Sequence, residues 1–335
     1  MGRRFEPDGA HSATPAYSWA RRMNKGPATM MSDRQSYVVW RTYGAGFWSI
    51  VASTVAHCDT AEQQGMTPVV DMENYPSVYQ EDSPVRGTRN VWEYYFQQPV
   101  GRSLAQLGES PLVTDGTIPR GYPREIGHET YRELWQKYAR LNNHAAEHIH
   151  NATVDLGISS RTLGVHFRGQ EMRTALGHKF PPTLGQMNEA IRHVMDNHDF
   201  DEILLVTEAQ QYVDSLRKRW GSRLYPSPTF RLWRQNSYRL KTEPRKWHRY
   251  RLGMEALQDA HLLAACGGYI CGHSGLSEAA LLISREPFVP HIRISQGRNS
   301  FRPYLAPWLW YAKATLPGAL GGFKKWIPDA PTSGG

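Results

Sequence analysis

Residues 37–47 read YVVWRTYGAGF, a short β-rich run followed by a glycine turn. A helix is predicted behind the turn, from Phe47 to Gln64, and Gly65 holds the position at which glycine commonly ends a helix. The run TPVVD over residues 67–71 predicts the next strand. Strand, turn, helix and strand form one βαβ unit, which predicts an α/β fold with a parallel sheet.

A second α/β pattern follows nearer the C-terminus. Its strands and helices alternate, and a short last strand is predicted at Phe288-Val289. We therefore expect two Rossmann-like domains that face a cleft, with ligands at the carboxyl ends of the strands. The predicted elements of this second pattern are 162–167, 186–198, 203–207, 209–220, 254–265, 268–272 and 278–283.

The remaining segments set the expected boundaries. Residues 1–35 are polar without a sustained period and are interpreted as a flexible leader. Residues 80–125 should be rich in loops, 131–149 read as one helical stretch, and 150–160 suit a linker between the domains. We expect domains over 36–155 and 156–300, and a helical, aromatic tail over 301–335.

Composition and charge limit the class of protein. The chain has 335 residues, enough for about two domains, and 40% of them are hydrophobic, which excludes disorder as its main state. Thirty-nine basic against 31 acidic residues leave a net charge of +8, which favours an anionic partner. Three cysteines are too few for a disulfide framework and favour a reducing compartment. With no signal peptide or membrane span visible, a cytoplasmic location is expected.

The first candidate motif is the turn Gly44-Ala45-Gly46. Glycines at such a turn let backbone N–H groups approach a phosphate or a sugar at a helix N-terminus, and Arg41 would add a cation. The residues match neither a G-x-G-x-x-G fingerprint nor a P-loop. A tight turn without any ligand explains them equally well.

The second candidate is the run from His166 to Arg173, at the carboxyl end of a predicted central strand. Alternation along the strand places His166 and Arg168 on one side. The planar guanidinium of Arg168 suits diphosphate oxygens, and Glu171 is expected to orient it or to accept a proton. An ordinary surface pair between arginine and glutamate is the alternative.

The third candidate is the small-residue turn from Gly272 to Ser277, where a strand passes into a helix. Its free N–H groups and hydroxyls suit an anion. A helix cap formed by Ser277 without a ligand is the alternative.

Two other readings of the sequence are weaker. His144 and His148 fit the H-x-x-E-H pattern of zinc peptidases, but the stretch is very polar and suits a solvated helix face. The basic and aromatic residues over 231–251 suit nucleic acid, yet the sequence contains no recognised nucleic-acid module, and a loop that closes over a nucleotide fits as well.

Taken in order, four stretches resemble the motifs of the fucosyltransferase superfamily, which includes rhizobial nodulation, N-glycan α1,6- and protein O-fucosyltransferases. The resemblance runs from about Tyr37 to Val289, and glutamate stands for the family's aspartate at Glu171 and Glu208. The matching stretches are Arg41-Thr42-x-Gly44-x-Gly46 with Trp48-Ser49, His166-x-Arg168-x-x-Glu171-Met172, Val206-Thr207-Glu208, and Asp259-Ala260-x-Leu262-Leu263-Ala264-x-Cys266 followed by Ser274-Gly275-Leu276-Ser277.

The resemblance implies a fold of the GT-B type and an inverting, metal-independent glycosyltransferase that moves L-fucose from GDP-fucose to a glycan or glycoconjugate. Domain 156–300 would bind the nucleotide sugar and domain 36–155 the acceptor. Arg168 would neutralise the diphosphate, and Glu171 is the first choice for the base, ahead of Glu93 and His178. The implied donor-binding residues are Gly44, Gly46, His166, Thr207, Glu208, Ser274, Gly275 and Ser277.

Some alternatives stay open on the sequence alone. The same fold would serve another nucleotide-sugar donor, and a non-catalytic module that binds a nucleotide or nucleic acid would also use the positive charge. No cofactor or metal is expected. The aromatic and basic tail, from Pro303 to Tyr311 with Lys313, Lys324 and Lys325, suits either packing across the domains or peripheral contact with a membrane.

Overall fold

The computed structural model describes residues 34–119, 122, 126–168, 171–231, 244–324 and 326. The predicted leader over 1–35 therefore lies almost wholly outside the described residues. Among the described residues, no helix is both long and apolar enough to cross a membrane.

The first sheet is parallel and has the strand order β2-β1-β3. It comprises β1 (Ser36–Val39), β2 (Thr67–Val70) and β3 (Leu112–Val113), and helix α1 (Phe47–Gln63) connects β1 to β2. The predicted βαβ unit is thus confirmed, and Gly65 adopts a left-handed φ of 72° just after α1. Strand β3 was not expected, because its two residues are half exposed and lie inside a segment rich in loop-forming residues.

The second sheet is also parallel, with the order β6-β5-β4-β7-β8. Its central strands are buried on both faces, as continuous apolar runs predict. The last strand does not lie at Phe288-Val289 but begins at His291, since Pro290 has no N–H to donate to the ladder. The strands are β4 (Thr162–His166), β5 (Glu202–Val206), β6 (Leu224–Pro226), β7 (Gly268–Cys271) and β8 (His291–Arg293).

The described residues also form seven further α-helices and several short 3-10 helices. The helical stretch predicted over 131–149 is two helices, because the Asn142 side chain accepts a hydrogen bond from the N–H of Ala145 at 2.9 Å and starts a new helix there. That second helix extends into the predicted linker. The helices are α2 (His128–Tyr138), α3 (Asn143–Asp155), α4 (Leu184–Asn197), α5 (Gln210–Trp220), α6 (His248–Ala264), α7 (Gly275–Ile283) and α8 (Ala306–Thr315).

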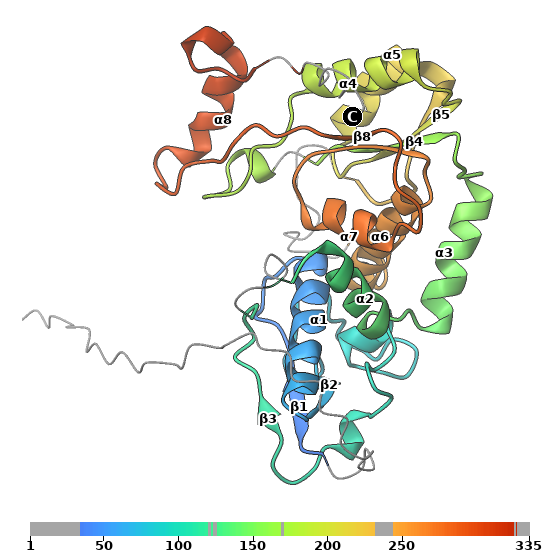
Figure 1. The fold of residues 1–335 in the computed structure, drawn as a ribbon, viewed down its shortest axis with the longest axis vertical. Helices are drawn as coiled ribbons and strands as arrows, with labels where there is room; N and C mark the ends of the chain where they lie inside the picture. Colours follow the sequence, from blue (N-terminus) through green and yellow to red (C-terminus); the bar gives the residue numbers. More distant parts are fainter. Residues whose placement is uncertain are drawn as a thin grey trace, which may run out of the picture. The chain divides into compact units, whose positions relative to one another are not determined.

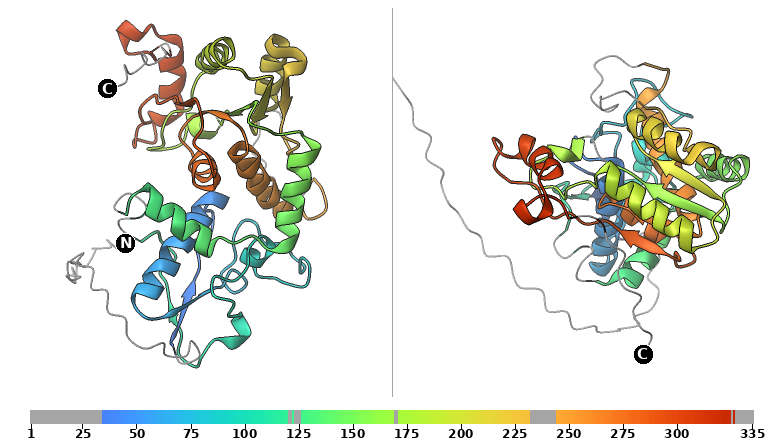
Figure 2. Two further views of the ribbon diagram at one scale, coloured as in Figure 1. Left: turned by 45° about the vertical axis from the view of Figure 1, so that its right-hand side comes forward. Right: turned by 90° about the horizontal axis from the view of Figure 1, so that it is seen from above.

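Helices cover both faces of the second sheet (Figures 1 and 2). One face, with Leu163 and Val165, packs against α4 and α5. The other face, with Leu204 and Tyr269, packs against α6 and α7 and joins the larger core that surrounds α1. The strand period of two thus divides one sheet between two hydrophobic cores.

Helices α1, α2 and α7 meet between the two sheets (Figure 1). The guanidinium of Arg132 on α2 donates to the carbonyl oxygens of Ser284 at 2.6 Å and Leu281 at 3.1 Å, which satisfies the C-terminal end of α7. Near the start of α6, the Tyr95 hydroxyl donates to the carbonyl oxygen of Tyr250 at 2.9 Å. These bonds fix α6 and α7 against the N-terminal half of the chain.

Candidate functional site

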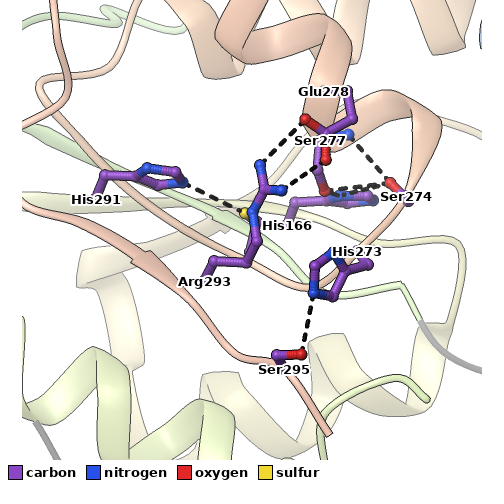
Figure 3. A network of polar contacts seen from close by, with 9 residues as sticks. His166, His273, Ser274, Ser277, Glu278, His291, Arg293 and Ser295 are labelled. Carbon is purple, nitrogen blue, oxygen red and sulfur yellow. Dashed lines mark hydrogen bonds and ion pairs between the residues drawn. The ribbon is translucent and has the colours of Figure 1, made fainter. Parts of the chain in front are cut away.

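The candidate site begins with His166, the last residue of β4 (Figure 3). Its Nδ1 lies 2.8 Å from the Ser277 hydroxyl and 3.4 Å from the Ser274 hydroxyl. The two serine oxygens lie 3.2 Å apart. Strand β7 is paired in parallel beside β4, so the turn that follows β7 brings both serines to the end of β4. The second and third sequence motifs therefore meet in space.

Ser274 is the N-cap of α7. Its hydroxyl accepts a hydrogen bond from the N–H of Ser277 at 3.0 Å, and the serine is only partly buried. The capping role predicted as an alternative for Ser277 thus belongs to Ser274. Ser277 is fully buried, and its hydroxyl contacts His166 instead, which positions the imidazole rather than facing a ligand directly.

His166 is neutral at physiological pH. Burial lowers its pKa to about 3, and the positive charge of Arg168 acts in the same direction. A neutral imidazole adds no charge to the site and leaves Arg168 as the cation at this strand end.

Arg168 and Glu171 form an ion pair just beyond β4. Their side chains are partly buried, at 29% and 24% exposure, so both still reach solvent. The carboxylate therefore holds the guanidinium at the carboxyl end of the sheet, where ligands bind in open α/β folds. This ion pair agrees with the orienting role predicted for Glu171 and equally with the surface pair given as the alternative, so the role stays a prediction.

The first motif lies next to the third. A Cβ added to Gly275, the first residue of α7, would lie 3.1 Å from the Cβ of Trp48 in the first turn of α1. The N-termini of α1 and α7 consequently approach each other, and Gly46 is the N-cap of α1. Gly44 has a left-handed φ of 88°, and the space around a Cβ at Gly44 or Gly46 is open.

Trp48 is a buried residue that the sequence analysis placed in the first motif but did not name as a site residue. Its indole Nε1 is buried and has no hydrogen-bond partner among the described residues. A buried indole N–H usually has a partner, and the Trp48 ring stacks on Trp135 within the core beside the N-termini of α1 and α7.

Thr207 and Glu208 follow β5, the neighbour of β4. The Thr207 hydroxyl donates to the carbonyl oxygen of Phe167 at 2.7 Å and accepts from the N–H of Ala209 at 3.2 Å. Thr207 is buried, so its hydroxyl joins the two strand ends. Glu208 is partly exposed beside them.

One buried acidic residue near the same sheet edge, Asp259, was not predicted as a site residue. Asp259 on α6 accepts a hydrogen bond from the Ser227 hydroxyl. The guanidinium of Arg231 donates to the carbonyl oxygen of Thr207 at 2.9 Å. Burial raises the pKa of Asp259 to about 7, although the Ser227 hydrogen bond and the Arg231 charge oppose the shift. The sequence drew attention to Asp259 only through the family motif, because a single acidic residue within a helix does not by itself indicate a functional site.

Asp259 makes a testable contribution to the pH dependence of stability. Its folded pKa lies above the unfolded value of about 4, so the stabilisation that the neutral carboxyl provides is lost as pH rises from about 4 to about 7. Asp259→Asn should therefore gain on the order of 3 kcal/mol relative to wild type across that range.

Urea unfolding of both proteins at pH 4.5 and pH 7.5 measures this gain. The opposing contribution of His166, which increases stability between about pH 3 and 6.5, is present in both proteins and cancels in the difference. An equal difference in unfolding free energy at both pH values would show that Asp259 ionises normally.

The other proposed bases lie in different surroundings. The carboxylate of Glu93 accepts hydrogen bonds from the Thr88 hydroxyl at 2.9 Å and the Gln98 amide at 2.8 Å, so it supports a loop. His178 is exposed, and its carbonyl oxygen accepts from the N–H of Asn299 at 2.8 Å.

The structure also shows the contacts of the histidine and arginine residues on which the weaker interpretations of the sequence depended. His144 Nε2 lies 3.0 Å from the Tyr250 hydroxyl, which gives it a protein partner. Arg231 is largely buried on backbone carbonyl oxygens, and Arg245 pairs with Glu255. Arg41 donates to the carbonyl oxygen of Gly116 at 2.7 Å rather than standing free beside the glycine turn. Arg234 and Arg239 lie outside the described residues.

A second layer of contacts supports the first turn of α7 (Figure 3). Arg293 on β8 pairs with Glu278 through two bonds of 2.7 and 3.2 Å. His273 Nε2 lies 3.1 Å from the Ser295 hydroxyl. The edge strand β8 thereby fixes the turn that carries Ser274.

Within the part of the chain that the structure describes, no group of three or more histidine, cysteine or acidic residues suits a metal ion, and metal independence stays a prediction.

No family model matches the sequence, and no curated protein matches it. Among solved structures, fucosyltransferase NodZ from Bradyrhizobium is similar to this chain at 16% identity, with 75% of this chain and 93% of that chain covered and a TM-score of 0.52. NodZ α1,6-fucosyltransferase soaked with GDP-fucose aligns at 18% identity over 75% and 92% of the two chains, with a TM-score of 0.48. A mutant of Arabidopsis thaliana FUT1 in complex with GDP aligns at 10% identity over 75% and 69%, with a TM-score of 0.44.

Only the first of these similarities is strong enough to compare folds. It confirms the α/β architecture of the GT-B type that the two βαβ patterns and the motifs predicted. The chain therefore shares its fold with the fucosyltransferase NodZ from Bradyrhizobium.

Proposed function

We propose that this protein is an inverting, metal-independent glycosyltransferase that moves L-fucose from GDP-fucose to a glycan or glycoconjugate. The observation that carries the proposal is Arg168, held by Glu171 at the end of β4 beside the His166–Ser277 pair. This guanidinium lies at the sheet edge where a nucleotide binds in such folds. The fold shared with NodZ and the order of the motifs along the chain support the same conclusion.

The proposed chemistry follows from charge. When the bond between fucose and GDP breaks, negative charge grows on the diphosphate and the sugar becomes positively charged. Arg168 would stabilise the diphosphate, together with the N–H groups at the α7 N-terminus beside Ser274. The N–H groups are fixed by the helix and Arg168 would exchange Glu171 for the diphosphate, so both interactions strengthen as the charge develops. They supply the positive charge that a metal supplies in other transferases.

The remaining residues have supporting roles in the proposal. Ser274 and the backbone around Gly275 would contact phosphate, and Ser277 would position His166 beside the nucleotide. Gly44 and Gly46 would let the α1 turn approach the donor from the opposite side. Thr207 and Glu208 would form the guanosine side, with Thr207 acting through the backbone it supports.

We propose Glu171 as the group that removes the proton from the acceptor hydroxyl. Its carboxylate is partly exposed and lies beside Arg168, where the leaving group would be. An attacking oxygen must approach from the opposite side of the sugar in an inverting reaction. To act as the base, Glu171 would have to leave Arg168 to the diphosphate as the donor binds and reach the acceptor on the face of the sugar opposite the leaving group.

Calorimetric titration with GDP, UDP and CDP tests the donor class. We expect GDP to bind at micromolar concentrations, more tightly than UDP or CDP, with the same affinity in the presence of EDTA. Tighter binding of UDP would favour the alternative of another nucleotide-sugar donor on this fold. Tighter binding of single-stranded RNA than of GDP would favour the non-catalytic module.

The C-terminal surface is the proposed membrane contact. Phe301, Tyr304, Trp308 and Leu320 are each at least 65% exposed, an unusual concentration of large apolar side chains. The sequence contains no acidic residue between Glu286 and Asp329, so the charged side chains of this stretch are all basic. Exposed aromatics among cations suit an anionic lipid interface.

Sedimentation with vesicles checks this contact. The protein should bind vesicles that contain phosphatidylserine, and Trp308→Ser should weaken binding about tenfold through the loss of buried apolar area. Val154→Ser removes an equally exposed apolar residue on α3 and should bind like wild type. Equal binding to neutral and anionic vesicles would contradict the proposal. The cytoplasmic location and the division into domains near residue 155 stay predictions.

A further inference from the structure

A cavity of about 350 Å³ lies between α3 and α6, and neither Arg168 nor Glu171 lines it. Its walls come from α3 and α6, from the loop around Arg86, from Pro228, and from the residues just before α6, Arg245 and Trp247. Pro228 belongs to the wall and follows β6, whose carboxyl end shares an edge of the sheet with β4. The lining residues used below are Arg86, His144, Trp247, Arg251, Glu255 and Gln258.

Backbone strain is concentrated at this cavity. Among the described residues, Arg86 and Trp247 are the only non-glycine residues with positive φ, at 51° and 55°. Both line the cavity, although they are 161 positions apart in the sequence. Left-handed backbone at a large side chain is costly and tends to persist at sites that bind ligands.

Positive charge also exceeds negative charge there. The lining contains three arginines and one acid, and that acid, Glu255, pairs with Arg245 through bonds of 2.5 and 2.9 Å. Arg86 and Arg251 form no ion pair with a carboxylate among the described residues. Two exposed guanidinium groups therefore remain at the mouth of the cavity.

A buried amide and an aromatic ring complete the wall. Gln258 is 4% exposed, and its Nε2 has no hydrogen-bond partner among the described residues. A buried amide donor without a partner is costly unless a bound molecule supplies the acceptor. Trp247 is partly exposed, at 36%, and presents an indole surface of the kind on which a sugar ring stacks.

We propose that this cavity binds a sugar residue that carries an anionic group, namely a carboxylate, a sulfate or a phosphate. Arg86 and Arg251 pair with the anion, the ring packs on Trp247, and the Gln258 amide donates to a sugar oxygen. Because the cavity opens near the same sheet edge as Arg168, the sugar is a remote unit of the acceptor glycan. In that last respect the inference rests on the proposed function.

Saturation-transfer NMR with small sugars tests the cavity directly. The ligands are glucuronic acid, glucose 6-sulfate, glucose 6-phosphate, neutral glucose and inorganic sulfate, each titrated into the full chain. We expect at least one charged sugar to bind about tenfold more tightly than glucose and inorganic sulfate, and the preferred one identifies the anion. Arg251→Ala should weaken it about tenfold, whereas Arg285→Ala, an exposed arginine elsewhere, should not.

Arg86→Gly provides a second variant, in which the new residue introduces no steric clash that could prevent folding. Glycine adopts the φ of 51° freely, so the change removes the cation and relieves the strained backbone. We expect weaker binding of the charged sugar with unchanged or higher thermal stability. Unchanged binding in both arginine variants, equal binding of glucose, or no binding of any sugar would overturn the proposal.

The same samples separate this inference from the proposed function. GDP affinity, measured in parallel, should be unchanged in Arg251→Ala because Arg251 is absent from the donor site. If GDP fails to bind while charged sugars bind as expected, the donor assignment is wrong and the cavity assignment stands. If GDP binds and charged sugars do not, the reverse holds.

Discussion

Replacing Arg168 with alanine should lower the rate at which GDP-fucose is hydrolysed by about 10²- to 10³-fold. The guanidinium lies at the end of β4, where it pairs with Glu171. On donor binding it would pair with the diphosphate instead, and this interaction strengthens as negative charge develops on the leaving group. Hydrolysis by water needs no acceptor and is followed through the release of GDP. Arg168→Lys keeps the charge without the planar fork and should retain part of the rate.

The matched control for this variant is Arg285→Ala. Arg285 is exposed after α7 and belongs to no described contact of the site, so its removal should leave the rate unchanged. Circular dichroism of Arg168→Ala should match wild type, because a partly exposed surface pair contributes little to stability. A folded Arg168→Ala variant with the wild-type rate would refute the role of this residue.

Valine at Gly275 should both destabilise the protein, by about 2 kcal/mol, and abolish GDP binding. A Cβ at this position meets the Cβ of Trp48 at 3.1 Å, and the two further methyl groups of valine leave α1 and α7 no room to stay in contact. Separation of these helices would move Ser274 and the glycine turn apart. Urea unfolding and calorimetry with GDP measure the two effects.

Gly185→Val serves as the comparison for this change. Gly185 lies in the first turn of α4 and is exposed, and the nearest atom to an added Cβ is 3.9 Å away. Helix propensity changes equally in both variants, so any additional loss at Gly275 reports the close approach to Trp48. If both valines cost the same and GDP still binds, the contact between the helices does not shape the site.

Five of the eight strands and most helices were predictable because their signals are local, whereas β3 and β6 were not predicted and β8 was misplaced. The run at residues 37–47 carries β-branched residues and a glycine turn, and the structure places β1 and α1 there. What local patterns did not predict were short or interrupted elements. Strand β3 has two residues, and the break between α2 and α3 depends on one cap at Asn142.

The site was predictable as a set of strand ends but not as a set of contacts. Parallel pairing of β4 with β7 brings His166 to Ser277 across 111 residues, and no spacing in the sequence encodes that distance of 2.8 Å. The capping serine was likewise not identified, because the sequence suggested Ser277 as the alternative cap and the structure gives that position to Ser274. Long-range pairing, rather than motif composition, decides which hydroxyl is buried.

A crystal structure with GDP bound tests the central claim most directly. The account predicts the diphosphate at the end of β4, with the Arg168 guanidinium within hydrogen-bond distance of its oxygens and the N-terminus of α7 beside it. GDP bound elsewhere, or in that place with Arg168 directed away from the phosphates, would contradict the account.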